Sequence, residues 1–205
     1  MAYFPFFIDI KDKKCCVIGG GNVAFRKLEA LMEFGADVTV ISPEISEDIR
    51  RLGGKLHIKS VEYQESDLKE AFFVIAATDN PEVNSKISRQ CMDNNILVNV
   101  VDEKEKCGFI FPAYIKKGDI SIGVTTSGKS PIMSHYIKQI IQRSIPDSYA
   151  ALVSTLGDYR SLVKKEIEDT GIRAEVFKEI ALIGTENNGN LTLEEVVSVI
   201  RKYKQ

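Results

Sequence analysis

Short apolar runs alternate with segments of helical periodicity along the first half of the chain. Residues 15–18 form a continuous apolar run that leads into three glycines, as expected of a strand buried on both faces. Apolar residues then recur at helical spacing from Val23 to Phe34, and a glycine follows where a helix is expected to end. A second helix is predicted to begin at Pro81 and to end near Met92. Five further apolar runs predict strands, at residues 38–41, 57–63, 72–77, 96–101 and 109–111.

The order of these elements predicts the architecture of this half. Strand, helix and strand repeated in this way indicate an α/β fold with a Rossmann-type doubly wound parallel sheet and right-handed crossovers. Such sheets bind ligands outside the carboxyl ends of their strands, near the point where the strand order reverses. Functional residues are therefore expected in the loops that follow the predicted strands.

A different pattern begins after residue 113. A strand is predicted at residues 119–124, and a helix is predicted from Pro131. From Pro146 onward three helices are predicted, and a capping box of Thr192 and Glu195 begins the last one. These helices span residues 149–167, 174–183 and 193–203. We expect three domains: an α/β domain over residues 1–113, an α+β domain over residues 114–146 and a small helical domain over residues 147–205.

Composition narrows the class of protein. The 205 residues are 44% hydrophobic and 27% charged with a net charge of −2, which is typical of a soluble globular protein. The 27 basic residues are scattered, so no nucleic-acid partner is predicted. The longest apolar run, residues 71–77, is too short to cross a membrane, and the first residues lack the basic charge of a signal peptide. We therefore expect a cytoplasmic location and four reduced cysteines.

The glycine-rich turn after the first strand fits a dinucleotide site. Residues 19–24 match Gly-x-Gly-x-x-Ala between a predicted strand and a predicted helix. Gly19 permits the tight turn, and Gly21 allows the backbone to approach a pyrophosphate. The amides of Asn22 and Val23 are expected to point from the helix N-terminus toward the phosphates. The alternative is a structural turn in a sheet that binds no nucleotide.

Two further loops are expected to border the same site. Ser42, Pro43 and Glu44 follow the second strand, where an acidic residue commonly binds the adenosine ribose. No arginine stands beside them to hold a 2′-phosphate, so NAD is predicted in preference to NADP. Thr78 and Asp79 follow the fourth strand and are expected to contact the cofactor from the other side.

A second phosphate-loop pattern occurs later in the chain. Residues 123–130, GVTTSGKS, match Gly-x-x-x-x-Gly-Lys-Ser. An ATPase would also need a following strand that ends in an acid for Mg²⁺, whereas only helical segments follow here. The turn still precedes a helix N-terminus, which attracts anions. Alternatively, Ser127 or Ser130 only caps that helix.

Six segments together resemble one known family. In this order and at this spacing, they resemble the precorrin-2 dehydrogenase/sirohydrochlorin ferrochelatase family of siroheme biosynthesis. The resemblance covers about residues 4–145 and extends more loosely into the helical tail. Because the sequence stops at Gln205, we do not expect the uroporphyrinogen methyltransferase module that is fused to some relatives. The segments are residues 5–9 (PFFID), 17–24 (VIGGGNVA), 76–79 (AATD), 99–102 (NVVD), 109–113 (FIFPA) and 126–131 (TSGKSP).

The resemblance implies a specific activity. It implies NAD-dependent dehydrogenation of precorrin-2 to sirohydrochlorin, followed in some members by insertion of Fe²⁺. It also implies a homodimer, with residues 114–146 as the dimerisation domain. In this family the aspartate that closes the Asn-Val-Val-Asp segment is the key catalytic carboxylate, which is Asp102 here. Asp102 follows the fifth predicted strand, at the ligand-binding edge of the sheet. On sequence alone a surface-loop residue is the simpler interpretation, and the resemblance reverses that preference.

The substrate that the resemblance implies suggests a role for the turn at residues 127–130. Precorrin-2 carries several acetate and propionate groups, so Ser127, Gly128, Lys129 and Ser130 are predicted to bind substrate carboxylates. No metal site is predicted, because His135 has no further ligand at suitable spacing. Two alternatives stay open: a ferrochelatase that has lost NAD binding, and a non-catalytic dinucleotide-sensing regulatory domain.

Overall fold

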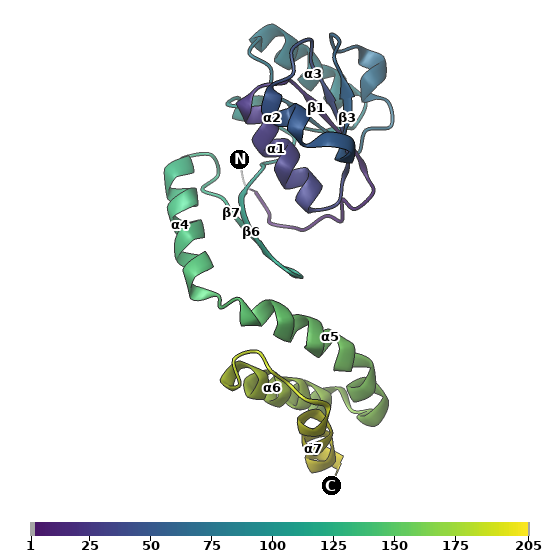
Figure 1. Ribbon diagram of the computed structural model, residues 1–205, viewed down its shortest axis with the longest axis vertical. Coiled ribbons are helices and arrows are strands. Elements are labelled where there is room, and N and C mark those ends of the chain that lie inside the picture. The colour runs from purple at the N-terminus through teal and green to yellow at the C-terminus, as the bar shows by residue number, and fades with distance from the viewer. Residues whose placement is uncertain (1–2, 205) are drawn as a thin grey trace. The chain divides into compact units, whose positions relative to one another are not determined.

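The computed structural model describes residues 3–204, without the side chain of Lys55. The chain divides into two compact units, Met1–Phe111 and Pro112–Gln205, which are described separately below (Figure 1). The division into three domains over residues 1–113, 114–146 and 147–205 stays a prediction.

The first unit is built on a parallel sheet of five strands in the order β3-β2-β1-β4-β5. In the central strand β1, Cys15 is in register with Val38 of β2 and with Phe73 of β4. The strand order reverses between β1 and β4, as in a doubly wound sheet, so the predicted Rossmann-type fold is confirmed. The strands are β1 Lys14–Ile18, β2 Asp37–Ile41, β3 His57–Lys59, β4 Phe73–Ala76 and β5 Leu97–Val100.

Helices cover both faces of this sheet, which explains the continuous apolar run of β1. Alternate residues of a strand point to opposite faces. Cys15 and Val17 pack in one cluster with Leu28 of α1, whereas Cys16 and Ile18 pack in another with Ile87 of α3. The helices are α1 Asn22–Glu33, α2 Glu47–Arg51 and α3 Pro81–Asp93, with short 3₁₀ turns at Gly53–Lys55, Glu65–Leu68 and Lys104–Lys106.

Two details of the sequence prediction differ from the structure. The third strand is shorter than predicted, and His57–Lys59 is exposed at the edge of the sheet. Residues 109–111 were expected to form a sixth strand, but they have no regular secondary structure. Their apolar character has another cause, because Phe109 packs against the Phe73 ring with centroids 5.3 Å apart.

The second unit begins with an antiparallel hairpin. Strand β6 Ala113–Lys117 pairs with β7 Ile120–Val124, so the strand predicted at residues 119–124 is present with a partner that the sequence pattern did not reveal. Helix α4 Pro131–Ser144 follows. Its C-terminal end is tied to the hairpin by Lys117, whose ammonium donates to the Ile145 carbonyl over 2.7 Å and to Asp147 over 2.6 Å.

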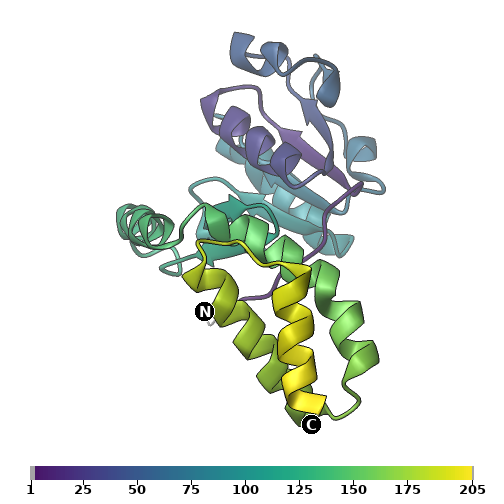
Figure 2. The ribbon, with the colours of Figure 1, turned by 60° about the horizontal axis from the view of Figure 1, so that its bottom comes forward.

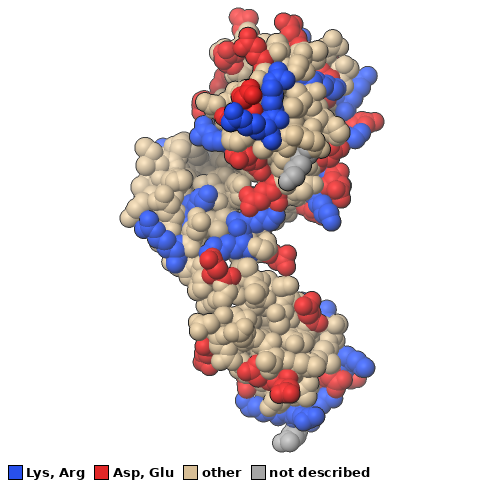
Figure 3. All heavy atoms as spheres, in the orientation of Figure 1, with Lys and Arg blue, Asp and Glu red and all other residues tan. Residues whose placement is uncertain are grey.

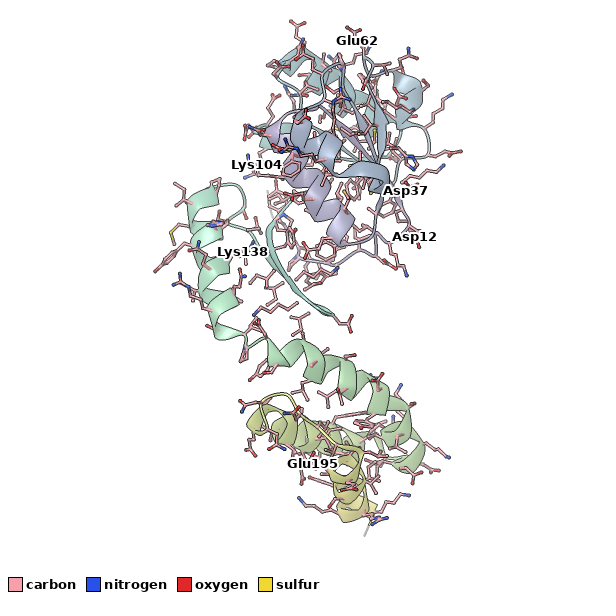
Figure 4. The ribbon with its side chains drawn as sticks, viewed as in Figure 1. Asp12, Asp37, Glu62, Lys104, Lys138 and Glu195 are labelled. Atoms are coloured by element: carbon pink, nitrogen blue, oxygen red, sulfur yellow. The ribbon has the colours of Figure 1, made fainter. Side chains whose placement is uncertain are left out.

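Three helices complete the second unit: α5 Ser148–Glu166, α6 Thr170–Glu186 and α7 Leu193–Lys204 (Figure 2). They bury their own apolar cluster, which includes Val163, Ile180 and Val196. The predicted capping box is present at the start of α7, where Figure 4 labels Glu195: the Thr192 amide donates to the Glu195 carboxylate over 2.8 Å. The Glu195 amide in turn donates to the Thr192 hydroxyl over 3.3 Å.

Three further observations bear on the class of protein. None of the described helices combines the length and apolar character that a membrane span needs. All four cysteines are free, and three of them are buried. On the visible face of the first unit, basic and acidic side chains are interspersed rather than segregated (Figure 3).

Candidate functional site

A cavity of about 1020 Å³ lies at the carboxyl edge of the parallel sheet. Figure 4 labels Glu62, which lines this cavity, and Asp37, which begins β2 at the opposite end of the unit. The ends of β1, β2, β4 and β5 all contribute to the cavity wall, and the structure therefore brings together every site residue predicted in the first unit. These residues are Gly19, Gly21, Asn22, Val23, Ser42, Pro43, Glu44, Thr78, Asp79 and Asp102.

The glycine turn is shaped by the backbone that surrounds it. A Cβ on Gly19, whose φ is +123°, would lie 2.2 Å from the Ala77 carbonyl oxygen. A Cβ on Gly20 would lie 1.9 Å from the Glu44 carbonyl oxygen, so the second glycine is as restricted as the first. A Cβ on Gly21 would meet no atom within 4 Å. Because Gly21 lines the cavity, the missing side chain leaves open space at the place where a pyrophosphate would approach.

The N-terminus of α1 faces this space. Gly21 is the N-cap and has no side chain to cap the helix, and the first turn contains no acidic residue. Asn22 and Val23 line the cavity, so the positive end of the helix dipole is directed at it. Ala24 is fully buried behind them, which lets α1 pack closely on the sheet. These features fit the diphosphate of a dinucleotide.

The loops after β2 and β3 form the next part of the wall. Ser42 is held by its amide, which donates to the Lys59 carbonyl over 3.1 Å, and Glu44 is exposed at the cavity. Tyr63 and Lys86 also line the cavity, with the Lys86 ammonium 5.9 Å from the centre of the Tyr63 ring. Neither residue was predicted from the sequence, because no motif places it near the glycine turn.

A buried asparagine fixes the loop after β4. The side-chain oxygen of Asn84 accepts from the Thr78 hydroxyl over 2.7 Å and from the Thr78 amide over 3.3 Å. The Asn84 side-chain amide donates back to the Thr78 carbonyl over 3.0 Å. Asn84 is only 5% exposed on the buried face of α3. Asn84 was not among the predicted site residues, although a polar residue at a core position of an amphipathic helix is a signal that could have identified it.

Asp102 lies at the cavity beyond the end of β5. Its φ is +62°, a left-handed conformation that aspartate adopts more readily than most residues. The preceding residue is tied to the sheet, since the Val101 amide donates to the Ala76 carbonyl over 3.0 Å. The buried side chain of Asn99 donates to the Phe109 carbonyl over 3.0 Å and so connects β5 to the chain that returns after the Asp102 turn.

The predicted substrate-binding turn belongs to the second unit. Ser130 is the N-cap of α4 and accepts from the Met133 amide over 3.3 Å, as the capping interpretation predicts. Ser127 and Gly128 have φ values of +56° and +76°, and the side chain of Lys129 is exposed. The Thr126 hydroxyl, absent from the predicted set, closes the turn by accepting from the Ser130 amide over 3.0 Å. Among the described residues no group of three His, Cys, Asp or Glu side chains could hold a metal ion.

A family model described as "Putative NAD(P)-binding" matches residues 6–113, a segment that holds the whole parallel sheet, the glycine turn and Asp102. The chain belongs to this NAD(P)-binding family.

Two relatives that match the chain are larger proteins. A siroheme synthase from Thioalkalivibrio sulfidiphilus is 35% identical over 207 residues, which cover 96% of this chain and 42% of that protein. A siroheme synthase from Methylobacillus flagellatus is 36% identical over 182 residues, which cover 87% of this chain and 38% of that protein. The chain therefore spans about two fifths of the length of these relatives, 42% and 38%.

A solved structure matches the chain over almost its whole length. The structure of "SirC, precorrin-2 dehydrogenase" covers 98% of this chain and 99% of its own, with a TM-score of 0.73 and 25% identity. The resemblance inferred from the six sequence segments is confirmed by these comparisons.

The glycine turn leads to a prediction about dinucleotide affinity. We expect Gly21→Ala to weaken NAD binding by roughly tenfold or more, because its methyl group would occupy space needed by the diphosphate. The melting temperature should stay close to that of the unchanged protein, since the methyl group meets no protein atom. Titration calorimetry with NAD measures the first quantity and calorimetric unfolding the second.

Gly54→Ala is the matched control. Gly54 also has open space around it and lies in a 3₁₀ turn that does not line the cavity. Equal NAD affinity in the Gly21→Ala and Gly54→Ala variants would contradict the placement of the diphosphate at Gly21.

Proposed function

We propose that the protein is an NAD-dependent dehydrogenase that oxidises precorrin-2 to sirohydrochlorin. One observation carries this proposal: Asp102 lies at the same cavity as the glycine turn, so a carboxylate and a dinucleotide site share one space. The names of its relatives, siroheme synthase and precorrin-2 dehydrogenase, support the same reaction.

Each part of the cavity has a role in this proposal. Gly19, Gly21 and the amides of Asn22 and Val23 hold the diphosphate at the start of α1. Ser42, Pro43 and Glu44 contact the adenosine ribose, and Thr78 and Asp79 contact the cofactor from the β4 side. Lys86 is the one cation among the described residues that line the cavity. No arginine lies beside Glu44 in the sequence to hold the 2′-phosphate of NADP, and this favours NAD.

Asp102 acts as the base. Dehydrogenation removes a hydride and a proton from the substrate, and bound NAD supplies the acceptor for the hydride. The carboxylate of Asp102 accepts the proton, which it passes on to solvent because its side chain is exposed. For Fe²⁺ insertion, which the family resemblance assigns to some members, the same carboxylate would take protons from pyrrole nitrogens.

The second unit supplies the substrate contacts and the dimer contacts. Lys129, together with Ser127, Gly128 and Ser130, binds carboxylate groups of the substrate in this proposal. We assign dimerisation to residues 114–146. In support, α4 exposes an apolar stripe to solvent, and much of its surface carries no charged atoms in Figure 3. The stripe consists of Ile132, Met133, Tyr136 and Ile140.

The reaction is tested by anaerobic incubation of the protein with precorrin-2 and NAD⁺, followed by visible spectroscopy. Sirohydrochlorin should form, and Asp102→Asn should lower kcat by roughly 10²–10⁴-fold with NAD affinity unchanged, as expected for loss of a general base. Asp93→Asn, at the exposed end of α3, is the control and should keep full activity. Fe²⁺ is then added to measure siroheme formation above the uncatalysed rate. If NAD binds while precorrin-2 stays unchanged, the enzyme proposal fails and a dinucleotide sensor becomes the better explanation.

The substrate turn is tested by charge reversal. Lys129→Glu should raise the KM for precorrin-2 by roughly tenfold or more, since a charge-assisted hydrogen bond contributes about 1.5–3 kcal/mol. Lys165→Glu, at an exposed position of α5, should leave that KM unchanged. An unaltered KM in the Lys129→Glu variant would remove Lys129 from the substrate site.

The dimer is tested by light scattering coupled to gel filtration. The protein should have twice the mass of one chain, and the double substitution Ile132→Glu with Ile140→Glu should reduce it to one chain, because two charges would be buried in the interface. Leu182→Glu, at an exposed position of α6, is the control and should stay dimeric. A single-chain mass for the unchanged protein would refute the assignment.

A further inference from the structure

Lys27 occupies an unusual environment for a lysine. It lies on α1, and its ammonium is 4.0 Å from the centre of the Phe111 ring. Burial, together with the charge of Arg26, lowers the pKa of Lys27, while Cys107 and Asp102 act in the opposite direction. Within residues 3–204 no carboxylate lies at ion-pair distance from this ammonium. The aromatic ring is therefore its closest electrostatic partner.

The Cys107 thiol holds the turn that follows Asp102 against β5. The sulfur of Cys107 accepts from the Val100 amide over 3.2 Å and lies 3.2 Å from the Val100 carbonyl oxygen and 3.3 Å from that of Glu103. The Gly108 amide donates to the Val98 carbonyl over 2.8 Å. Through these contacts the chain that follows Asp102 returns to β5.

Phe111 ends the segment that follows Asp102 and is the last residue of the first unit. The turn is hydrogen-bonded to β5, whereas Phe111 is fixed by packing against the cluster around α1 and by the Lys27 ammonium. The segment that follows Asp102 is thus attached to the helix that begins at the glycine turn. Lys27 lies five residues after Asn22, which corresponds to about 7.5 Å along the helix axis.

We propose that Lys27 is a positioning residue, which holds the Asp102–Phe111 segment against α1 and so fixes the Asp102 carboxylate relative to the dinucleotide turn. A desolvated ammonium over an aromatic ring is a strong and directional contact, and Phe111 is the only described residue with which Lys27 makes a cation–π contact. The inference rests on the proposed function for its catalytic consequence, but the structural restraint itself can be measured without substrate.

A second lysine provides a matched comparison. Lys13 also lies over a phenylalanine ring, that of Phe72, at 5.9 Å. It directly precedes β1 and therefore lies at the end of the sheet opposite to the cavity. Replacement of Lys13 removes a contact of the same kind without touching the Asp102 turn.

The first measurement is amide hydrogen exchange of the protein without added ligand. Lys27→Met keeps the aliphatic stem and removes the charge, so the amides of Cys107 and Gly108 should exchange roughly tenfold faster while those of α3 are unchanged. Lys27→Arg, which can also stack on the ring, should restore slow exchange, and Lys13→Met should have no effect on the turn. Unchanged exchange in Lys27→Met, or faster exchange throughout the first unit, would overturn the proposal.

The second measurement separates this inference from the proposed function. With precorrin-2 and NAD⁺, Lys27→Met should lower kcat by roughly tenfold and leave the KM for NAD within about twofold, because the cofactor site is intact while Asp102 is displaced. Lys27→Arg should recover most of the rate. If the unchanged protein is inactive, the proposed function fails while the exchange result still decides the role of Lys27. If the unchanged protein is active and Lys27→Met has the same kcat, only the positioning role fails.

Discussion

The close approach of three backbone segments at the glycine turn is the constraint on which the rest of the structure depends. Gly19 lies against the carbonyl of Ala77, and Gly20 lies against that of Glu44, at distances that leave no room for a side chain. The carboxyl ends of β1, β2 and β4 can meet only because both positions are glycine. That convergence directs the N-terminus of α1 into the cavity and brings the loops after β2 and β4 to its walls.

The Asp102 side of the cavity depends on the same sheet edge. β5 pairs with β4, and the Val101 amide is bonded to Ala76, so the position of Asp102 follows from the position of the strand that borders Gly19. A left-handed residue at Asp102 turns the chain back toward β5 and α1. The cofactor turn and the carboxylate are therefore parts of one framework rather than two separately placed features.

The sequence pattern was sufficient for the parts of the fold that depend on local periodicity. The apolar run of β1 predicted a strand buried on both faces, and alternate residues of that run do pack in the two separate clusters. Residues 109–111 show the limit of this reasoning. They are apolar but form no strand, because Phe109 packs on Phe73 instead. Lys86 was missed for a related reason: α3 brings it to Tyr63, and only the tertiary structure shows which residues that helix face meets.

The burial of the cysteines has a consequence for how the protein responds to oxidants and alkylating reagents. Burial raises the pKa of Cys15 and of Cys16 to about 12, and that of Cys91 to about 11. Near neutral pH, about one in ten thousand or fewer of these thiols is ionised, and the thiolate is the reactive form. Together with burial, this makes the three thiols chemically inert in the folded state. Only Cys107 is partly accessible, so covalent damage to the native protein by a thiol reagent would be concentrated beside the Asp102 turn.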